Sequence, residues 1–238
     1  GSVLKPELQN SLTLGVEQGL GSFGRVQFEY WEKQSVNSAD SEQLFNTGVL
    51  FPIHVAKGIF RGWNARFDAR YNAWSSFLSL GKTRAIFVAP VTGGLRLEEP
   101  EFVPGTAFLI DHDQKLSAVF GLRYQKASTY IQLLGRYDSG LVAGDPADGQ
   151  GSDYAFGAAY IEEDYDSTFG PLYRIKPRTI WNLSVGFRLA EFEKKKIDVS
   201  LDALNMFDKK GLYNFLSVFG GTHVIPPRTL TLRIKYQF

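Results

Sequence analysis

Few side chains in this sequence could bind a metal ion or catalyse a reaction. The chain has three histidines and no cysteine, and only Asp111-His112-Asp113 places carboxylates directly beside an imidazole. Such groups are common ligands of divalent cations. No fourth ligand follows at a fixed spacing, so the alternative is the start of a strand whose polar side chains bind backbone amides. We interpret the segment in this second way and predict neither a metal site nor a cofactor.

Two other patterns suggest chemistry less strongly. An acidic cluster between Glu162 and Asp166 could bind Ca²⁺, but its spacing matches no known calcium loop, and we interpret it as a solvated loop. Ser117 follows His112 closely, yet a catalytic triad is defined by geometry and not by proximity in sequence. Nothing in the sequence activates this serine, so we predict that the protein is not an enzyme.

Composition narrows the class of protein. The 238 residues are 14% aromatic and carry a formal net charge of only +1, which argues against a nucleic-acid-binding protein. No apolar run reaches the length of about 18 residues that a transmembrane helix needs. A chain without such a helix can cross a membrane only with β-strands, because lipid offers the backbone no hydrogen-bond partners. The absence of cysteine fits export to an oxidising compartment.

The clearest strand pattern lies in the last eleven residues, RTLTLRIKYQF. Leu230, Leu232 and Ile234 alternate with polar residues such as Arg233 and Lys235. Because side chains alternate across a strand, the segment predicts a ribbon with one apolar face and one cationic face. A strand of an outer-membrane barrel has these properties, since it meets lipid on one side and a wet lumen on the other.

Eight earlier segments repeat this alternation. Their approximate ranges are 12–20, 26–31, 62–71, 74–86, 116–124, 131–138, 181–189 and 197–203. Short turns alternate with four long connections, namely 37–58, 88–113, 141–177 and 208–227. This organisation predicts an all-β fold, an antiparallel up-and-down transmembrane β-barrel or partial barrel of nine or ten strands, with short periplasmic turns and long outer loops. A tenth strand would lie in 154–160 or 212–219.

Charged residues gather on one face of these expected strands, and the other face carries almost none. In a barrel, the charged face would line the lumen. The predicted lumen-facing residues are Arg66, Asp68, Arg70, Arg123, Arg136, Asp138, Arg188, Asp198, Asp202, Arg233 and Lys235. A soluble β-sandwich also alternates with period two, so that alternative stays open. The alternating loop lengths and the aromatic residues near the strand ends favour the membrane barrel.

Four short motifs occur in a fixed order along the chain. They are Lys5-Pro6-Glu7 with Leu14-Gly15-Val16-Glu17, Asp111-His112-Asp113-Gln114, Asp202-Ala203-Leu204-Asn205-Met206-Phe207-Asp208, and Pro226-Pro227-Arg228-Thr229 with Tyr236-Gln237-Phe238. Each resembles a segment in the barrel of TonB-dependent outer-membrane receptors. Together they imply the C-terminal part of such a barrel, which in transporters of this kind has about 22 strands and a plugged lumen.

The resemblance also implies an organisation and a set of partners. Gly1-Ser2 looks like a cloning remnant, and residues 3–238 are expected to form a single β-barrel domain, the C-terminal portion of a larger barrel without its plug domain. The implied partners are outer-membrane lipid, a plug domain, the TonB complex and the barrel-assembly machinery, with no nucleic acid. Tyr236 and Phe238 would form the assembly signal.

The implied function is uptake of a ligand across the bacterial outer membrane. The outer loops would bind the ligand, and His54, His112 and His223 are candidate contacts because they lie in or beside those loops. The lumen charges would pair with one another, contact the plug, or line a polar path. Two alternatives remain, a complete small pore or adhesin barrel and a soluble β ligand-binding module. Nine strands favour a piece of a larger barrel, whose open sheet edge would be closed, covered or paired with a second copy.

Overall fold

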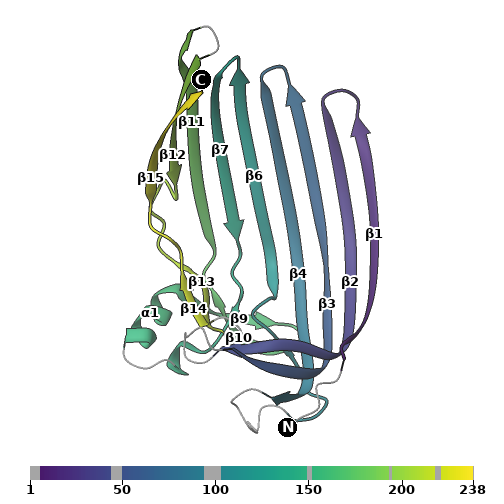
Figure 1. Ribbon diagram of the computed structural model, residues 1–238. Coiled ribbons are helices and arrows are strands. Elements are labelled where there is room, and N and C mark those ends of the chain that lie inside the picture. The colour runs from purple at the N-terminus through teal and green to yellow at the C-terminus, as the bar shows by residue number, and fades with distance from the viewer. Residues whose placement is uncertain are drawn as a thin grey trace.

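The protein folds as one curved antiparallel sheet with small additional elements at one end (Figure 1). The computed structural model describes residues 6–43, 50–93, 103–148, 152–192, 195–217 and 221–237. The long strands are β1 Leu8–Leu20, β2 Gly24–Gln43, β3 Leu50–Tyr71, β4 Trp74–Gly93, β6 Gln114–Lys126, β7 Thr129–Asp138, β11 Arg178–Phe192, β12 Lys195–Leu204 and β15 Thr229–Gln237. Each pairs with the next long strand in the chain. The predicted up-and-down topology and strand number are therefore confirmed.

The sheet is a partial barrel. Within the described residues, β1 pairs only with β2, and β15 pairs only with β12. Figure 1 shows these two strands at opposite edges of the curved sheet, without contact between them. Both edges therefore present backbone groups that another strand could pair with.

The shorter elements gather at the end of the sheet opposite the tight turns (Figure 1). They are β5 Ala107–Leu109, β8 Val142–Ala143, η2 Pro146–Asp148, α1 Ser152–Tyr160, β9 Ile161–Asp166, β10 Gly170–Ile175, β13 Leu212–Ser217 and β14 Gly221–Val224. Neither candidate for a tenth strand joins the main path, because 152–160 is helical and β13 forms a separate hairpin with β14. No helix in the described part of the chain is long and apolar enough to span a membrane.

Tight turns join the strand pairs at the other end. The connections at Gly21, Asn72 and Ala127 have positive φ angles of 65°, 52° and 51°. Hairpin turns of two or three residues commonly contain such left-handed backbone, which in the two-residue turns matches the right-handed twist of the flanking strands. Glycine and asparagine adopt it readily, whereas alanine does so at a cost. The sequence located all three turns correctly.

The prediction of a loop over 37–58 is wrong at most of its positions. Strands β2 and β3 continue past it, with Ser38 opposite Val55 and Asp40 opposite Ile53. Ser, Asn and Asp are typical of turns, but here their backbone groups are satisfied by the extended ladder of the hairpin. Asn37 has a φ of 53°, which is irregular for a strand, but the pairing of β2 with β3 continues on both sides of it.

Within the described residues, the buried hydrophobic clusters lie at the end that carries the short elements. Val55, Ala85, Phe87 and Ile110 form one buried cluster, and Ile161, Ile175, Leu212 and Phe215 form another. Along the two edge strands, by contrast, apolar side chains are exposed, as at Leu14 on β1 (60%) and Leu232 on β15 (64%). The described part of the chain therefore places no protein layer over the apolar face of the edge strands.

Aromatic rings lie close to glycines on neighbouring strands. Phe77 faces Gly121 directly across β4 and β6, and Tyr130 faces Gly186 across β7 and β11. A methyl group added at Gly121 would lie 2.2 Å from the Phe77 ring, and one at Gly186 would lie 2.4 Å from Tyr130. Such pairs restore packing where glycine leaves a strand without a side chain.

Replacement of Gly121 by alanine should destabilise the fold, because the Phe77 ring occupies the space that the new methyl group needs. We expect a loss of about 1–3 kcal/mol in the free energy of unfolding, measured by denaturant titration in detergent. Gly19→Ala is the matched control, since no atom lies within 4 Å of the position its methyl group would take. Equal stability of the two variants would refute the packing role of the Phe77–Gly121 pair.

Candidate functional site

The strand register places all eleven predicted lumen residues on one face of the sheet. Residues opposite one another in a ladder share a face, and the register connects the strands in sequence. Asp68 is opposite Arg25, and Asp198 is opposite both Arg188 and Lys235. We call this side the polar face and the reverse side the apolar face. That the polar face lines a lumen stays a prediction.

Ion pairs within one strand and between neighbouring strands neutralise part of the polar face. Asp68 accepts hydrogen bonds from Arg25 at 3.1 Å and from Arg66 at 2.8 Å. Arg188 donates to Asp198 at 3.0 Å. These contacts agree with the mutual pairing that the sequence suggested as the simplest role for the charges. Because the side chains are partly solvated, each pair contributes little to stability.

Two arginines also stack on the aromatic rings of the polar face. The Arg66 guanidinium lies 4.7 Å from the centre of the Phe77 ring, and that of Arg123 lies 4.6 Å from the centre of the Tyr130 ring. In each stack the aromatic ring lies against the glycine of the neighbouring strand, and the guanidinium lies against the ring. Cation–π contact of this kind fixes the position of a long side chain that would otherwise be mobile.

Asp113, the last residue of the Asp111-His112-Asp113 segment, is buried and belongs to an ion-pair network. The Asp113 carboxylate pairs with the guanidinium of Arg174, whose Nη1 also donates to the Asp113 backbone carbonyl at 3.0 Å. The backbone amide of Ala85 donates to the same carboxylate at 3.4 Å. Asp113 thus binds an arginine and a backbone amide, which agrees with the structural interpretation of this motif. Among the described residues, no three metal-ligating side chains gather into a group.

The acidic cluster of 162–166 belongs to the same network. Asp164 accepts hydrogen bonds from Arg174 at 2.7 Å and from Lys115 at 2.6 Å. Asp166 forms a two-pronged pair with Arg84, in which Nη2 lies 2.7 Å from the carboxylate. The carboxylates thus attach the β9–β10 hairpin to the middle of β4 and to the start of β6. We call this set, made of Arg84, Asp113, Lys115, Asp164, Asp166 and Arg174, the outer ion-pair network.

The three candidate histidines lie on separate elements. His54 is on β3 opposite Thr92, where a loop was expected. The His112 ring lies 2.9 Å from the Asp111 carboxylate, which raises the pKa of the imidazole. His223 is on β14, and its Nδ1 lies 2.9 Å from the Asn214 side chain. Their role in ligand contact stays a prediction.

A second buried charge pair was not foreseen from the sequence. Arg178 and Asp138 are both buried, and Arg178 lies 3.7 Å from the Asp138 carboxylate. The guanidinium also lies 5.2 Å from the ring of Tyr213, which comes from the β13–β14 hairpin. The burial of Arg178 and of Arg174 could not be predicted from the sequence, because neither residue differs in its sequence context from other arginines near strand ends. Both side chains are buried because the short hairpins pack against the sheet.

The predicted assembly signal is described only in part. Tyr236 lies on the apolar face of the edge strand β15 and is about half exposed. Phe238 lies outside the described residues. The proposed role of these two residues in barrel assembly stays a prediction.

The pair between Arg84 and Asp166 should make the β9–β10 hairpin sensitive to acid. Arg84 and the backbone amides of Thr168 and Phe169 hold the pKa of Asp166 well below its usual range. In the unfolded chain the carboxyl group of an aspartate has a pKa of about 3.9. Because the pKa of Asp166 is lower in the folded protein, its ionised carboxylate stabilises the fold at every pH above about 3.9. This stabilisation is lost progressively as the pH falls from about 3.9 toward the pKa of the folded state.

We expect Asp166→Asn to cost about 1.5–3 kcal/mol at neutral pH and to remove most of this acid sensitivity. Hydrogen–deuterium exchange of residues 161–175 at pH 7 and pH 3 measures both effects. Glu162→Gln is the control, because that exposed side chain lies on the same strand outside the network. An unchanged exchange rate in Asp166→Asn would contradict this role.

Solved structures with a similar fold include import receptors and a transporter. The ferric-catecholate import receptor Fiu from Escherichia coli K12 matches with a TM-score of 0.58 and 14% identity, over 96% of this chain and 27% of that chain. The FrpB iron transporter from Neisseria meningitidis matches with a TM-score of 0.60 and 16% identity, over 97% of this chain and 30% of that chain. The pyoverdine outer-membrane receptor FpvA from Pseudomonas aeruginosa PAO1 matches with a TM-score of 0.59 and 14% identity, over 99% of this chain and 30% of that chain.

No family model matches the sequence, and no curated protein matches it either. At these low identities the structural matches establish the fold alone. The chain spans about 30% of the length of these receptors. The predicted resemblance is thus confirmed at the level of structure: in fold, the chain is a partial β-barrel like that of the TonB-dependent receptors.

Proposed function

We propose that this chain forms part of the barrel wall of a TonB-dependent outer-membrane receptor that imports a ligand. The observation that carries the proposal is the division of one open sheet into a charged face and an exposed apolar face over nine successive strands. In the intact receptor, the apolar face would meet lipid and the polar face would surround a plug domain. The chain would then act as a transporter component and not as an enzyme.

The distribution of aromatic residues supports the membrane orientation. Trp74 and Tyr124 lie on the apolar face beside the tight turns, with ring centres 4.9 Å apart. Exposed Tyr71 lies at the same end. Trp and Tyr favour the boundary between lipid and water, so these rings fit the periplasmic girdle of a barrel.

The opposite end fits the ligand-binding side. There the short elements are tied to the sheet by two apolar clusters and by the outer ion-pair network. A platform fixed in this way would hold the outer connections in place for ligand contact, with His112 and His223 nearby in the chain. Because the Fiu and FrpB matches are receptors or transporters for iron compounds by name, an iron complex is the ligand class to test first.

The arrangement of strands argues against closure by a second copy. The nine strands alternate in direction, so β1 and β15 run the same way. Two copies in the same membrane orientation would therefore join through parallel strands, whereas bacterial membrane barrels are antiparallel. Closure needs an odd number of additional strands, which the remaining barrel of a larger receptor would supply. This disfavours both the small complete barrel and self-pairing through the open edges.

Partition between water and detergent tests the membrane assignment. With its apolar face exposed, the purified chain should require detergent or lipid to stay monomeric, and cell fractionation should place it in the outer membrane. A water-soluble monomer without detergent would instead support a soluble β ligand-binding module and reject our proposal.

A pair of substitutions on β15 tests which face meets lipid. Leu232 and Arg233 are neighbours on opposite faces of this strand. Leu232→Arg should weaken insertion into lipid vesicles by about 2–4 kcal/mol, because it places a charge in the bilayer. Arg233→Leu should have a much smaller effect. If Arg233→Leu were the more harmful variant, the assignment of the two faces would be reversed.

A further inference from the structure

The polar face contains a hollow near the tight turns, with a volume of about 360 Å³. We propose that this hollow is an oxyanion site that binds the carboxylates of an acidic polypeptide segment. The proposal rests on the proposed function, in which another domain covers the polar face. Our inference adds that the segment of this domain that meets the hollow is acidic.

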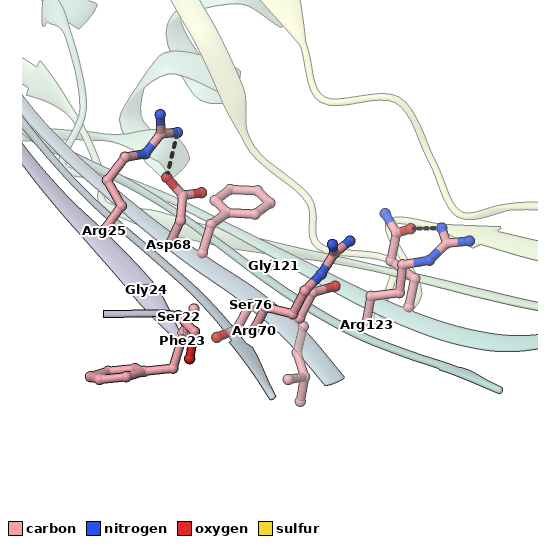
Figure 2. A pocket seen from close by; sticks show the side chains of 14 residues that line it. Ser22, Phe23, Gly24, Arg25, Asp68, Arg70, Ser76, Gly121 and Arg123 are labelled. Carbon is pink, nitrogen blue, oxygen red and sulfur yellow. Dashed lines mark hydrogen bonds and ion pairs between the residues drawn. The ribbon is translucent and has the colours of Figure 1, made fainter. Parts of the chain in front are cut away.

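Three residues in one row across the sheet form the centre of the site. Arg70 on β3 is opposite Ser75 on β4, and Ser75 is opposite Arg123 on β6. Neighbouring strands lie about 4.8 Å apart, so the two arginines flank the serine hydroxyl at a distance that their long side chains can span. Figure 2 shows Arg70 between Arg25 and Arg123, with all three side chains on the same side of the sheet.

Among the described residues, neighbouring side chains do not neutralise the positive charge of this row. Asp68, the only acidic residue among those that the structure shows lining the hollow, is already paired with Arg25 and Arg66. The Arg70 side chain forms no ion pair within the described part of the chain. Arg123 donates to the neutral amide oxygens of Gln132 at 2.9 Å and Gln125 at 3.2 Å. These bonds orient the Arg123 guanidinium, and no carboxylate in the described ranges pairs with it.

The chemistry of the donors selects an oxyanion. Arginine presents a planar fork of N–H groups that matches a carboxylate or a phosphate, and such charge-assisted hydrogen bonds are short and strong. Ser75 adds a hydroxyl donor between the two forks. A neutral ligand would leave both guanidinium groups uncompensated in a partly enclosed hollow, which is unfavourable.

A second cationic hollow lies at the same end of the polar face, and this is why we assign a polypeptide, which can reach both hollows, and not a single small ion. The second hollow has a volume of about 330 Å³ and is lined by Arg188, Asp198, Arg233 and Lys235 beside the β6–β7 turn. Asp198 is paired with Arg188, whereas Arg233 and Lys235 form no ion pair within the described residues. Two cationic hollows along the same end of the polar face complement an extended acidic segment that reaches both.

Peptide binding to the full 238-residue chain in zwitterionic detergent tests the site. The probe is a fluorescein-labelled peptide of alternating Asp and Gly, measured by anisotropy at low salt against an Asn/Gly peptide of equal length. We expect the chain to bind the Asp peptide at least tenfold more tightly. The double variant Arg70→Gln/Arg123→Gln should lose at least tenfold in affinity.

Lys57→Gln/Arg61→Gln is the matched control, since it removes the same charge from the apolar face near the other end of the sheet. This control should bind the Asp peptide within about twofold of the original chain. An equal loss in both double variants, or no loss in Arg70→Gln/Arg123→Gln, would overturn the proposal. Binding of inorganic phosphate without binding of the acidic peptide would overturn the assignment of a polypeptide occupant.

Charge reversal keeps the test decisive if the neutral variant folds poorly. Arg70→Glu/Arg123→Glu should bind a Lys/Gly peptide in preference to the Asp/Gly peptide, with circular dichroism confirming its strand content. Failure to reverse the preference in the folded variant rejects the site. Detergent partition of the same samples reports the membrane assignment separately, so failure of this site and failure of the proposed function can be distinguished.

Discussion

The structure depends on the register of the hydrogen-bonded ladder between its nine long strands. Side chains alternate across each strand, so a slip of one residue would move a whole strand's charged residues to the apolar face. Direct pairings such as Arg188 with Asp198 and Phe77 with Gly121 are compatible with only one register. The division into two chemically different faces is therefore a consequence of strand pairing, and both proposed properties of the protein follow from that division.

The two ends of the sheet are stabilised by different means. Near the tight turns, left-handed turn residues shape the hairpins, ring–glycine pairs join one hairpin to the next, and the described residues form little buried core. At the other end, apolar clusters and buried ion pairs attach the short elements to the strands. A buried ion pair such as Arg174 with Asp113 contributes less to stability than its strength suggests, because both charges lose hydration. Its contribution here is to fix where the β9–β10 hairpin sits.

This contrast also separates two kinds of charge. The charges of the outer ion-pair network neutralise one another within the protein, as Arg84 neutralises Asp166. On the polar face beside the tight turns, two arginines share Asp68, whereas Arg70 and Arg123 have no carboxylate partner in the part of the chain that the structure describes. Carboxylates do not outnumber basic side chains in the outer ion-pair network or on the polar face beside the tight turns. The unneutralised arginines lie where a covering domain would meet the sheet.

Sequence alone determined the features that depend on local alternation and turn chemistry. The period-two pattern of a strand such as RTLTLRIKYQF, together with residues such as Gly21 and Asn72, was enough to predict the antiparallel class, the number of strands, the tight turns and the grouping of the eleven charges. Only the tertiary structure decided that residues 37–43 extend a strand, that residues 152–160 form a helix, and that Arg174 and Arg178 are buried. The physical reason is that these outcomes depend on contacts between segments far apart in the chain. Similarly, Arg70, Ser75 and Arg123 form one site because register aligns three strands, and no spacing along the sequence indicates it.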